Sequence, residues 1–496
     1  MRVVFVIPPF DFAWSVGNVF KKARNGVLPP LGVGFLAAAL EANGHETLLV
    51  DAMAEQFNVA ETAAAVAALR PDLVGVSIIT FMNAPAAMAT VAALRGALGA
   101  TPIVLGGAHV TTRGLAVLND FPGADYAIPG DGEIPLCGLV DALASGAPVS
   151  ECPGLWLRDA SGTPVATPDA PKLNDLDLFA PPARHLYKQD LYRPLPSLNL
   201  GSRVATAITA RGCPWAKCAF CHQGSGCSPV FRRRSPEHVV DELEMLAREH
   251  GARSIVFFDD NFCVMPGWIR RFCDLLDGRG LRLKWSILAR ADTVTPEMLR
   301  RMADSGCYSV QFGFESGNQD ILDLIHKGIT LDQCRNAVRW ARAAGLEIRG
   351  SFMLGFPTET PEMSEETIRF ACELNADYML FFAYHVLPDT ALEEVALNHG
   401  RLCPSENFNV HLPSYVPDTY PDGEALAQMI RTAYSRYYLR PAYVLQLLRR
   451  TLRRPQLIYN HMVGLVFWAG LMAGGAGNSA ASHVAPPVAP PAAPGK

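Results

Sequence analysis

Three cysteines lie close together in the middle of the chain, within the segment RGCPWAKCAFC. Cys213, Cys218 and Cys221 are spaced C-x4-C-x2-C, so three thiolates on one loop can face a single metal centre. Soft sulfur ligands select zinc, copper or iron–sulfur clusters over hard cations. A structural zinc site needs four protein ligands, and no second pair of cysteines or histidines follows at the usual distance. We therefore expect an iron–sulfur cluster with one open iron, with zinc and a purely structural cysteine group as the alternatives.

The surroundings of these cysteines resemble a known family. Residues 204–210 (VATAITA) read as a buried strand, so the cysteines follow a strand's C-terminal end, where barrel enzymes place their chemistry. The loop resembles the signature of the radical SAM family, usually C-x3-C-x2-C with an aromatic residue before the last cysteine, here Phe220. The first gap is one residue longer than that pattern. The resemblance implies a 4Fe-4S cluster on the three cysteines, with S-adenosylmethionine (SAM) bound beside Phe220.

Apolar segments that end in polar residues continue for about two hundred residues. Helix-like segments separate them, as at residues 236–250 and 296–305. The resemblance implies that Arg290, Glu315 and Ser316, at strand ends, help to hold SAM. The ordinary alternative for Glu315 is a strand-end carboxylate that pairs with a neighbouring Arg or Lys. Six βα units follow one another, which predicts a partial, TIM-like (β/α)6 barrel over residues 203–390. The expected strands are residues 204–210, 254–258, 283–289, 307–313, 350–357 and 378–385.

Residues 1–150 form a different unit, in which short apolar strands alternate with helical stretches. This alternation predicts an α/β fold with an open, doubly wound, Rossmann-like parallel sheet and ligands at the strand C-termini. Glycines at strand ends let a ligand approach the backbone closely. The small or polar residues at these ends are Ser77, Thr80, Gly106, Gly107, His109, Gly130 and Glu133.

This N-terminal unit resembles the cobalamin-binding domain that is fused to many radical SAM enzymes. No G-x-G-x-x-G follows the first strand, which removes the main support for a dinucleotide site. The resemblance implies that the strand-end residues form the cobalamin site, with Ser77, Gly106 and Gly107 lining the slot for the nucleotide tail. The motif D-x-H-x-x-G, whose His ligates cobalt, is replaced by VDAMAEQ at residues 50–56. We therefore expect base-off cobalamin without histidine ligation. His109 either contacts the cofactor or, as an equal alternative, is a loop histidine that forms a hydrogen bond to the backbone.

The composition limits the class of protein. The chain has 496 residues, long enough for three domains, and 49% of them are hydrophobic, ample for packed cores. The net charge of -5 argues against a nucleic-acid partner. The chain begins in a strand rather than in a cleavable segment, so we expect a cytoplasmic protein with mostly reduced cysteines. Cys227, six residues after Cys221, is a candidate catalytic thiol.

The remaining segments have less specific signals. Residues 151–202 are expected to be a linker, residues 391–480 a helical region, and residues 481–496 a disordered Pro/Ala-rich tail. Within the helical region, basic residues precede an apolar run at 462–473, which is shorter than the ~20 residues of a spanning helix. This pattern suits either peripheral contact with the inner face of a membrane or a helical cap on the barrel. The basic residues are Arg449, Arg450, Arg453 and Arg454.

Together these features predict a cobalamin-dependent radical SAM methyltransferase. As the resemblance implies, it cleaves SAM reductively at the 4Fe-4S cluster and transfers a methyl group from methylcobalamin to an unactivated carbon or phosphorus centre. The expected partners are a small-molecule or lipid-like substrate and an electron donor such as flavodoxin or ferredoxin. The alternatives are a cyclase or rearrangement enzyme without methyl transfer, in tetrapyrrole or natural-product biosynthesis, and a non-enzymatic sensor of cobalamin or redox state.

Overall fold

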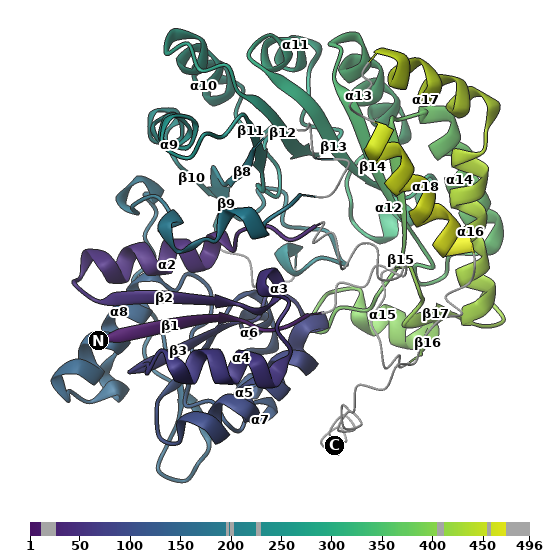
Figure 1. Ribbon diagram of the computed structural model, residues 1–496. Coiled ribbons are helices and arrows are strands. Elements are labelled where there is room, and N and C mark those ends of the chain that lie inside the picture. The colour runs from purple at the N-terminus through teal and green to yellow at the C-terminus, as the bar shows by residue number, and fades with distance from the viewer. Residues whose placement is uncertain are drawn as a thin grey trace. The chain divides into compact units, whose positions relative to one another are not determined.

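The computed structural model describes residues 1–10, 26–194, 198, 203–224, 230–403, 411–453 and 458–472. The chain divides into two compact units (Figure 1). The described part of unit 1 comprises residues 1–10 and 36–171, and that of unit 2 lies within residues 26–35 and 172–472. Cys227 and the tail at 481–496 lie outside the described residues, so the predictions for them are untested.

Unit 1 is built on a seven-stranded sheet with the order β2-β1-β3-β4-β5-β6-β7. The pairs from β2 to β5 are parallel, which confirms the expected open α/β sheet. The last two strands add an antiparallel edge, although the sequence suggested only a linker there. The strands are β1 (Arg2–Ile7), β2 (Glu46–Asp51), β3 (Leu73–Ser77), β4 (Ile103–Gly106), β5 (Tyr126–Ala127), β6 (Trp156–Arg158) and β7 (Pro164–Ala166).

Helices connect the parallel strands of unit 1. Val4, Val74 and Leu105 are fully buried, one on each of three neighbouring strands, as expected for a sheet that is covered on both faces. The helix α2 runs across the boundary between the two units. The helices are α2 (Leu31–Ala42), α3 (Ala52–Glu55), α4 (Val59–Ala68), α5 (Ala84–Leu98), α6 (Ala108–Arg113), α7 (Val117–Asp120) and α8 (Glu133–Ser145).

Unit 2 contains a six-stranded sheet with the order β15-β14-β13-β12-β11-β8. Every pair in it is parallel, and β8 and β15 are its two edges, so the expected partial barrel is confirmed. Two antiparallel pairs stand beside it: β9 (Ala210–Arg211) with β10 (Arg232–Arg233), and β16 (Gly400–Leu402) with β17 (Tyr415–Pro417). The barrel strands are β8 (Val204–Ala207), β11 (Ser254–Phe257), β12 (Lys284–Ala289), β13 (Cys307–Glu315), β14 (Glu347–Leu354) and β15 (Tyr378–Ala383).

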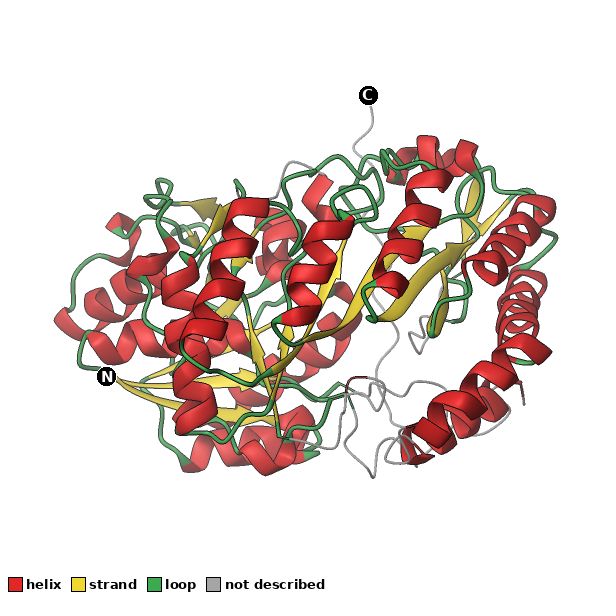
Figure 2. Ribbon diagram, turned by 90° about the horizontal axis from the view of Figure 1, so that it is seen from above, coloured by secondary structure: helices red, strands yellow, loops and turns green. Residues whose placement is uncertain are grey.

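Figure 2 shows the helices in red beside the strands in yellow. Several helices of unit 2 begin with strong local signals. In α9, α11 and α14 a Ser or Thr side chain caps the helix and a proline takes the first position: Ser235, Thr295 and Thr360 are these caps. The helices are α9 (Pro236–Arg248), α10 (Pro266–Gly278), α11 (Pro296–Asp304), α12 (Gln319–Leu324), α13 (Leu331–Ala343), α14 (Pro361–Leu374), α15 (Glu393–Asn398), α16 (Gly423–Tyr438), α17 (Pro441–Arg453) and α18 (Ile458–Met472).

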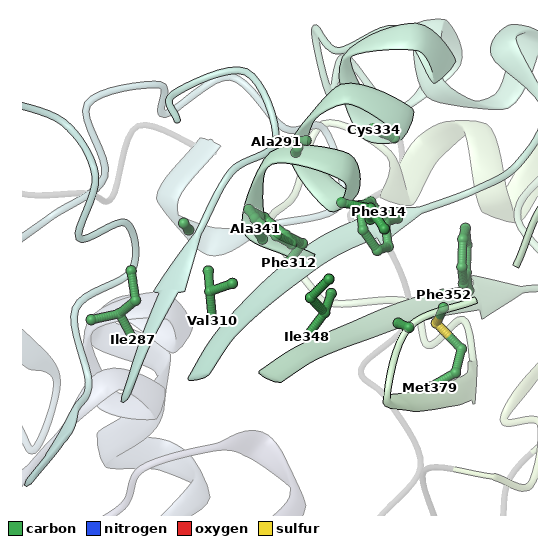
Figure 3. Close-up of a cluster of buried hydrophobic side chains, with 14 of the residues drawn as sticks. Ile287, Ala291, Val310, Phe312, Phe314, Cys334, Ala341, Ile348, Phe352 and Met379 are labelled. Carbon is green, nitrogen blue, oxygen red and sulfur yellow. The ribbon is translucent and has the colours of Figure 1, made fainter. Parts of the chain in front are cut away.

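The main core of unit 2 lies between the barrel sheet and its helices. Phe312 and Phe314 of β13 are fully buried and share one apolar cluster with Ala341 of α13 (Figure 3). Because successive side chains of a strand point to opposite faces, Gly313 faces away from this core. Glu315 lies past a shift in the pairing with β14, and its carboxylate lies beside Gly313, on the same side of the strand.

The helix α17 packs against the barrel sheet. The Arg450 guanidinium lies 2.6 Å from a Glu347 carboxylate oxygen and 3.3 Å from one of Asp377. The Tyr443 hydroxyl donates to the Asp377 carbonyl at 3.0 Å. This packing is what the helical-cap alternative predicted for this part of the chain. Among the described residues, no helix is both long and apolar enough to cross a membrane.

A buried charge network fixes residues of the expected linker to the barrel. The Glu242 carboxylate of α9 accepts from Arg184 and from Arg234, each at 2.5 Å, and all three side chains are at most 3% exposed. Burial by itself raises the pKa of Glu242, but the two guanidinium groups outweigh it and the pKa is lowered. Arg184 also donates to the Thr206 carbonyl of β8 at 2.8 Å.

We predict that Glu242→Ala destabilises unit 2 by about 3–5 kcal/mol, because two buried arginines lose their carboxylate. The measurement is the midpoint of urea unfolding. The control is Glu237→Ala, on the same helix as Glu242. It removes an exposed ion pair with Arg271 of α10 and should cost no more than about 1 kcal/mol. Since the folded pKa of Glu242 is lowered, the wild-type advantage should be complete above about pH 5 and shrink as the pH falls below about 4. Equal losses of unfolding free energy in the two variants would contradict the prediction that the buried network stabilises unit 2 more than the exposed ion pair does.

Candidate active site

The three cysteines lie on one loop of unit 2, between β9 and a short 3-10 turn at His222–Gly224. Their thiols are half-buried and free. Burial raises the pKa of Cys221 to about 11, and the neighbouring thiols of Cys218 and Cys213 act in the same direction. The three sulfurs are thus close enough to interact electrostatically. The Cys221 N–H donates to the Cys218 carbonyl at 3.1 Å, which turns the loop back on itself.

Residues 325–328, the clamp segment, hold this loop in place. Three consecutive carbonyls of the clamp segment accept hydrogen bonds, two from the cysteine loop and one from the end of β12. The donors and acceptors are Ala219 N–H and Ile325 O at 2.9 Å, Trp215 Nε1–H and His326 O at 3.0 Å, and an Arg290 guanidinium N–H and Lys327 O at 2.7 Å.

The clamp segment also supports the indole of Trp215. A Cβ on Gly328 would lie 2.1 Å from this ring, and Gly328 has a φ of 68°, so glycine is required there twice over. The guanidinium of Arg290 lies 4.7 Å from the ring centroid and the ammonium of Lys217 5.3 Å. A hollow of about 560 Å³ opens beside Trp215 and Lys217.

Arg290 places a positive charge beside the cysteine loop. It follows β12 directly, and its side chain is only 7% exposed. The guanidinium binds both carboxylate oxygens of Asp292, at 3.0 and 3.1 Å. Its remaining terminal nitrogen lies 3.9 Å from the Cys218 sulfur. The arginine expected to hold SAM is therefore already paired with a carboxylate, and it lies beside one of the cysteines expected to hold the cluster.

Glu315 is the last residue of β13, and its carboxylate forms a buried ion pair. Its Oε1 lies 2.7 Å from the Lys327 ammonium, and the two residues are 9% and 6% exposed. Burial alone lowers the pKa of Lys327, but the Glu315 carboxylate outweighs it and the pKa is raised. This is the pairing that the alternative for Glu315 predicted. No motif in the sequence marks Lys327, and its burial beside Glu315 is a feature of the folded chain.

The other two residues expected at the SAM site are Ser316, which has polar neighbours, and Phe220, which packs against an aromatic ring. Ser316 is fully buried, and its hydroxyl accepts from the Asn318 N–H at 3.1 Å and lies 3.3 Å from the Thr367 hydroxyl. Phe220 packs edge-on against Phe356, with ring centroids 6.0 Å apart. Both residues lie near the strand ends, and their contact with SAM stays a prediction.

The cysteine loop fits a cluster better than a single ion. Within the described residues, no three His, Cys, Asp or Glu side chains converge closely enough to hold one ion. A mononuclear zinc needs all its ligands at about 2.0–2.3 Å from one point, whereas each thiolate of a 4Fe-4S cluster binds a different iron. Thiols that interact electrostatically without converging, beside the cation of Arg290, suit the cluster.

In unit 1, the strand ends gather most of the residues expected at a cobalamin site. Ser77 and Gly106 face each other in the β3–β4 register. A Cβ on Gly106 would meet nothing within 4 Å, and the same holds for Gly130, so a ligand has room beside both. Gly107 differs, because its Cβ would lie 2.5 Å from the Ile78 carbonyl oxygen and its φ is 101°.

The remaining expected cobalamin residues shape the loops at this edge. The backbone N–H of His109 donates to the Ile78 carbonyl at 3.1 Å. Thr80 caps a short turn by bonding to the Asn83 side chain at 3.0 Å. Glu133 starts α8 and is 5% exposed. These positions fit the expected slot, and the individual roles stay predictions.

Two protein-family models match the chain. The radical SAM superfamily matches residues 207–371, which include the three cysteines, Arg290 and Glu315. The B12 binding domain matches residues 17–140, which include the strand-end residues of unit 1.

Characterised and uncharacterised relatives cover most of the chain. An uncharacterised methyltransferase of Pyrococcus horikoshii is 31% identical over 89% of this chain and 93% of that protein. An anaerobic magnesium-protoporphyrin IX monomethyl ester cyclase of Rubrivivax gelatinosus is 29% identical over 90% of this chain and 78% of that protein. The two relatives are thus named for different reactions.

A solved structure has the same fold. It is the radical SAM methyltransferase TsrM from Kitasatospora setae, with cobalamin and a [4Fe-4S] cluster bound. The TM-score is 0.69 with 20% sequence identity, and the match covers 89% of each chain. At this identity the likeness concerns the fold.

We predict that replacing Cys213, Cys218 and Cys221 with Ala removes the iron that reconstituted protein binds, about four atoms per chain for a 4Fe-4S cluster. The measurements are iron and sulfide content and the visible absorbance after anaerobic reconstitution. Cys372→Ala, at a half-buried free cysteine of α14, is the matched control and should keep its iron. Iron that persists in the triple variant would show that the ligands lie elsewhere.

Proposed function

Because the chain belongs to the radical SAM enzymes that carry a cobalamin-binding domain, we propose that it methylates an unactivated carbon or phosphorus centre of a small or lipid-like molecule. Its cofactors are a 4Fe-4S cluster, SAM and cobalamin. When bound, the cluster supplies the electron that cleaves SAM, and cobalamin carries the methyl group. The similarity to a methyltransferase over nearly the whole length of both proteins carries this proposal.

The chain's own residues would bind and position these cofactors. Cys213, Cys218 and Cys221 would hold the cluster on the loop that the clamp segment fixes. The Glu315 carboxylate suits the ammonium group of SAM, with Ser316 and Phe220 beside it. Arg290 suits the carboxylate of SAM only if it gives up part of its pairing with Asp292, which it now binds through two nitrogens.

A reduced protein would supply the electron. Radical SAM enzymes need a reductant, and we propose a flavodoxin or a ferredoxin. The cysteine loop reaches the surface at Lys217, which is exposed and lines the hollow beside Trp215. A donor bound at this point would stand one residue from the cluster ligand Cys218. Acidic donors would also match the charge of Lys217.

The cyclase alternative has a relative of its own, so the two reactions need a direct test. We predict that the reduced holoenzyme, incubated with methyl-labelled SAM and no substrate, moves the label to the protein-bound cobalamin. A methyltransferase has to load its methyl carrier, whereas a cyclase does not. The measurement is mass spectrometry of the extracted cobalamin. Label that stays in SAM, while SAM is still cleaved, would favour cyclisation or rearrangement.

The two C-terminal helices expose an apolar face. In α17, Leu445, Leu448 and Leu452 are 48%, 56% and 81% exposed, and in α18 Met462 and Leu465 are each 63% exposed. Between residues 441 and 474 the sequence has four arginines and no Asp, Glu or Lys. We propose that this face lies on an anionic membrane surface, where each free arginine adds about 1 kcal/mol. Arg450 is committed to Glu347 and contributes less.

We predict that the intact protein co-sediments with phosphatidylglycerol vesicles at low salt and that binding falls as salt rises. Replacing Leu448 and Leu452 with Glu should weaken binding roughly tenfold or more, because two apolar side chains are lost from the contact. The control is Leu178→Glu, which changes an equally exposed leucine (67%) outside this face. If the intact protein stays in the supernatant, the membrane contact is ruled out. If the molar mass of the protein in solution rises with protein concentration, the apolar face binds a second copy of the chain instead.

A further inference from the structure

One face of the barrel sheet carries a buried arginine, Arg349 of β14. The preceding residue, Ile348, belongs to the apolar core between the sheet and its helices (Figure 3). Because successive side chains of a strand point to opposite faces, Arg349 lies on the face that turns away from this core, which we call the inner face. Its guanidinium lies 5.5 Å from the ring centroid of Tyr378, its register partner on β15.

The charge of Arg349 has only a distant partner. The side chain is 8% exposed, and the nearest carboxylate oxygen among the described residues, Glu347 Oε1, lies 4.0 Å from Nε. The other oxygen of Glu347 is taken by Arg450 of α17, at 2.6 Å. None of the described residues accepts a hydrogen bond from the Arg349 guanidinium, and its Nε is buried. A buried charge without hydrogen bonds is costly, so packing alone does not account for an arginine at this position.

Polar side chains surround Arg349 on the inner face. Gln311 of β13 is its register partner, and Ser351 follows two residues later on β14. Both are half-buried. The hydroxyl of Ser309, two residues before Gln311, is buried and has no hydrogen-bond partner among the described residues. Guanidinium, amide and hydroxyl groups are the donors that bind carboxylates and phosphates.

Apolar side chains flank this polar group. Leu288 of β12 is the register partner of Gln311, and Leu380 of β15 is that of Ser351. Both leucines are only half-buried, although they lie inside a sheet whose other face is fully packed. The inner face therefore offers an organic molecule both apolar contacts and a cation.

The position of Arg349 separates it from the expected SAM residues. On β14 it lies three residues before Phe352, the register partner of Glu315. This is about 10 Å along the strand at ~3.3 Å per residue. A group bound to Arg349 therefore lies deeper along the strands than SAM at Glu315, and the rest of the same molecule can extend toward the strand ends.

We propose that Arg349 binds an oxyanion group, a carboxylate, phosphate or phosphonate, of the molecule that the enzyme methylates. The guanidinium pairs with two oxygens of this group, and Gln311 and Ser351 donate to it. Arg349 thereby selects anionic substrates and positions them, and no bond to it forms or breaks. The role of the ligand as methyl acceptor rests on the proposed function, whereas binding of the anion needs neither SAM nor methyl transfer.

The test is isothermal titration calorimetry of the reconstituted full-length protein with phenylphosphonate, which joins an apolar ring to an oxyanion. Wild-type protein should bind it saturably and should bind neutral benzyl alcohol roughly tenfold more weakly or worse. Arg349→Met should lose about tenfold or more in affinity for phenylphosphonate. Arg349→Lys keeps the charge without the fork of donors and should lie between the two. The matched control is Arg300→Met, at an exposed arginine of α11, which should bind as the wild type does.

A purely structural role of Arg349 predicts a different stability. Because the guanidinium gives no hydrogen bond to the described residues, an apolar side chain of similar length should leave the midpoint of urea unfolding unchanged or raise it. A clearly lower midpoint in Arg349→Met would assign the arginine to the stability of the barrel and overturn the proposal.

The binding outcomes also separate this inference from the proposed function. If wild-type protein does not bind phenylphosphonate, or if Arg349→Met binds it equally well, the anion site is wrong. Complete displacement of phenylphosphonate by SAM would place the anion in the SAM site and also overturn the proposal. None of these measurements involves methyl transfer, so failure of the labelled-SAM experiment on the wild type leaves the anion site standing, and the reverse also holds.

Discussion

The hydrogen bonds between the clamp segment and the cysteine loop are the constraint on which the site depends. A loop that carries three thiols has no apolar core of its own, and its backbone groups need partners. The clamp segment supplies three carbonyls in a row, and the Trp215 ring rests on the backbone at Gly328. The same few residues therefore fix the cysteine loop, the guanidinium of Arg290 and the backbone of Lys327 in one arrangement.

The fold could be predicted from the sequence because its signals are local, and the three cysteines that we expect to hold the cluster stand out for the same reason. Each barrel strand is a short apolar run, and the cysteine spacing lies within nine residues. The hairpin of β6 and β7 could not be found in this way. Its strands have three residues each and include Arg158 and Pro164, so that neither length nor composition distinguishes them from a linker.

Lys327 shows a different limit of sequence analysis. It stands in the segment HKGIT, where a lysine before a glycine suggests an exposed turn. Lysine is among the residues that are least often buried, so its burial follows only from tertiary contacts. The partner, Glu315, is twelve residues away in the sequence, and no helical or strand periodicity links the two. The sequence does contain Gly328 directly after Lys327. The need for glycine there becomes clear only from the structure, in which the Trp215 ring leaves no room for a Cβ.

The end of β13 shows how backbone strain serves this arrangement. Glu315 has a φ of 66°, and the pairing of β13 with β14 shifts between Gly313 and Glu315. A left-handed conformation costs a non-glycine residue about 1–3 kcal/mol and persists only where the surroundings hold it. Here the ion pair with Lys327 and the space above Gly313 do so. The strained residue places its carboxylate beside Gly313 of its own strand, where it accepts the hydrogen bond of the Lys327 ammonium.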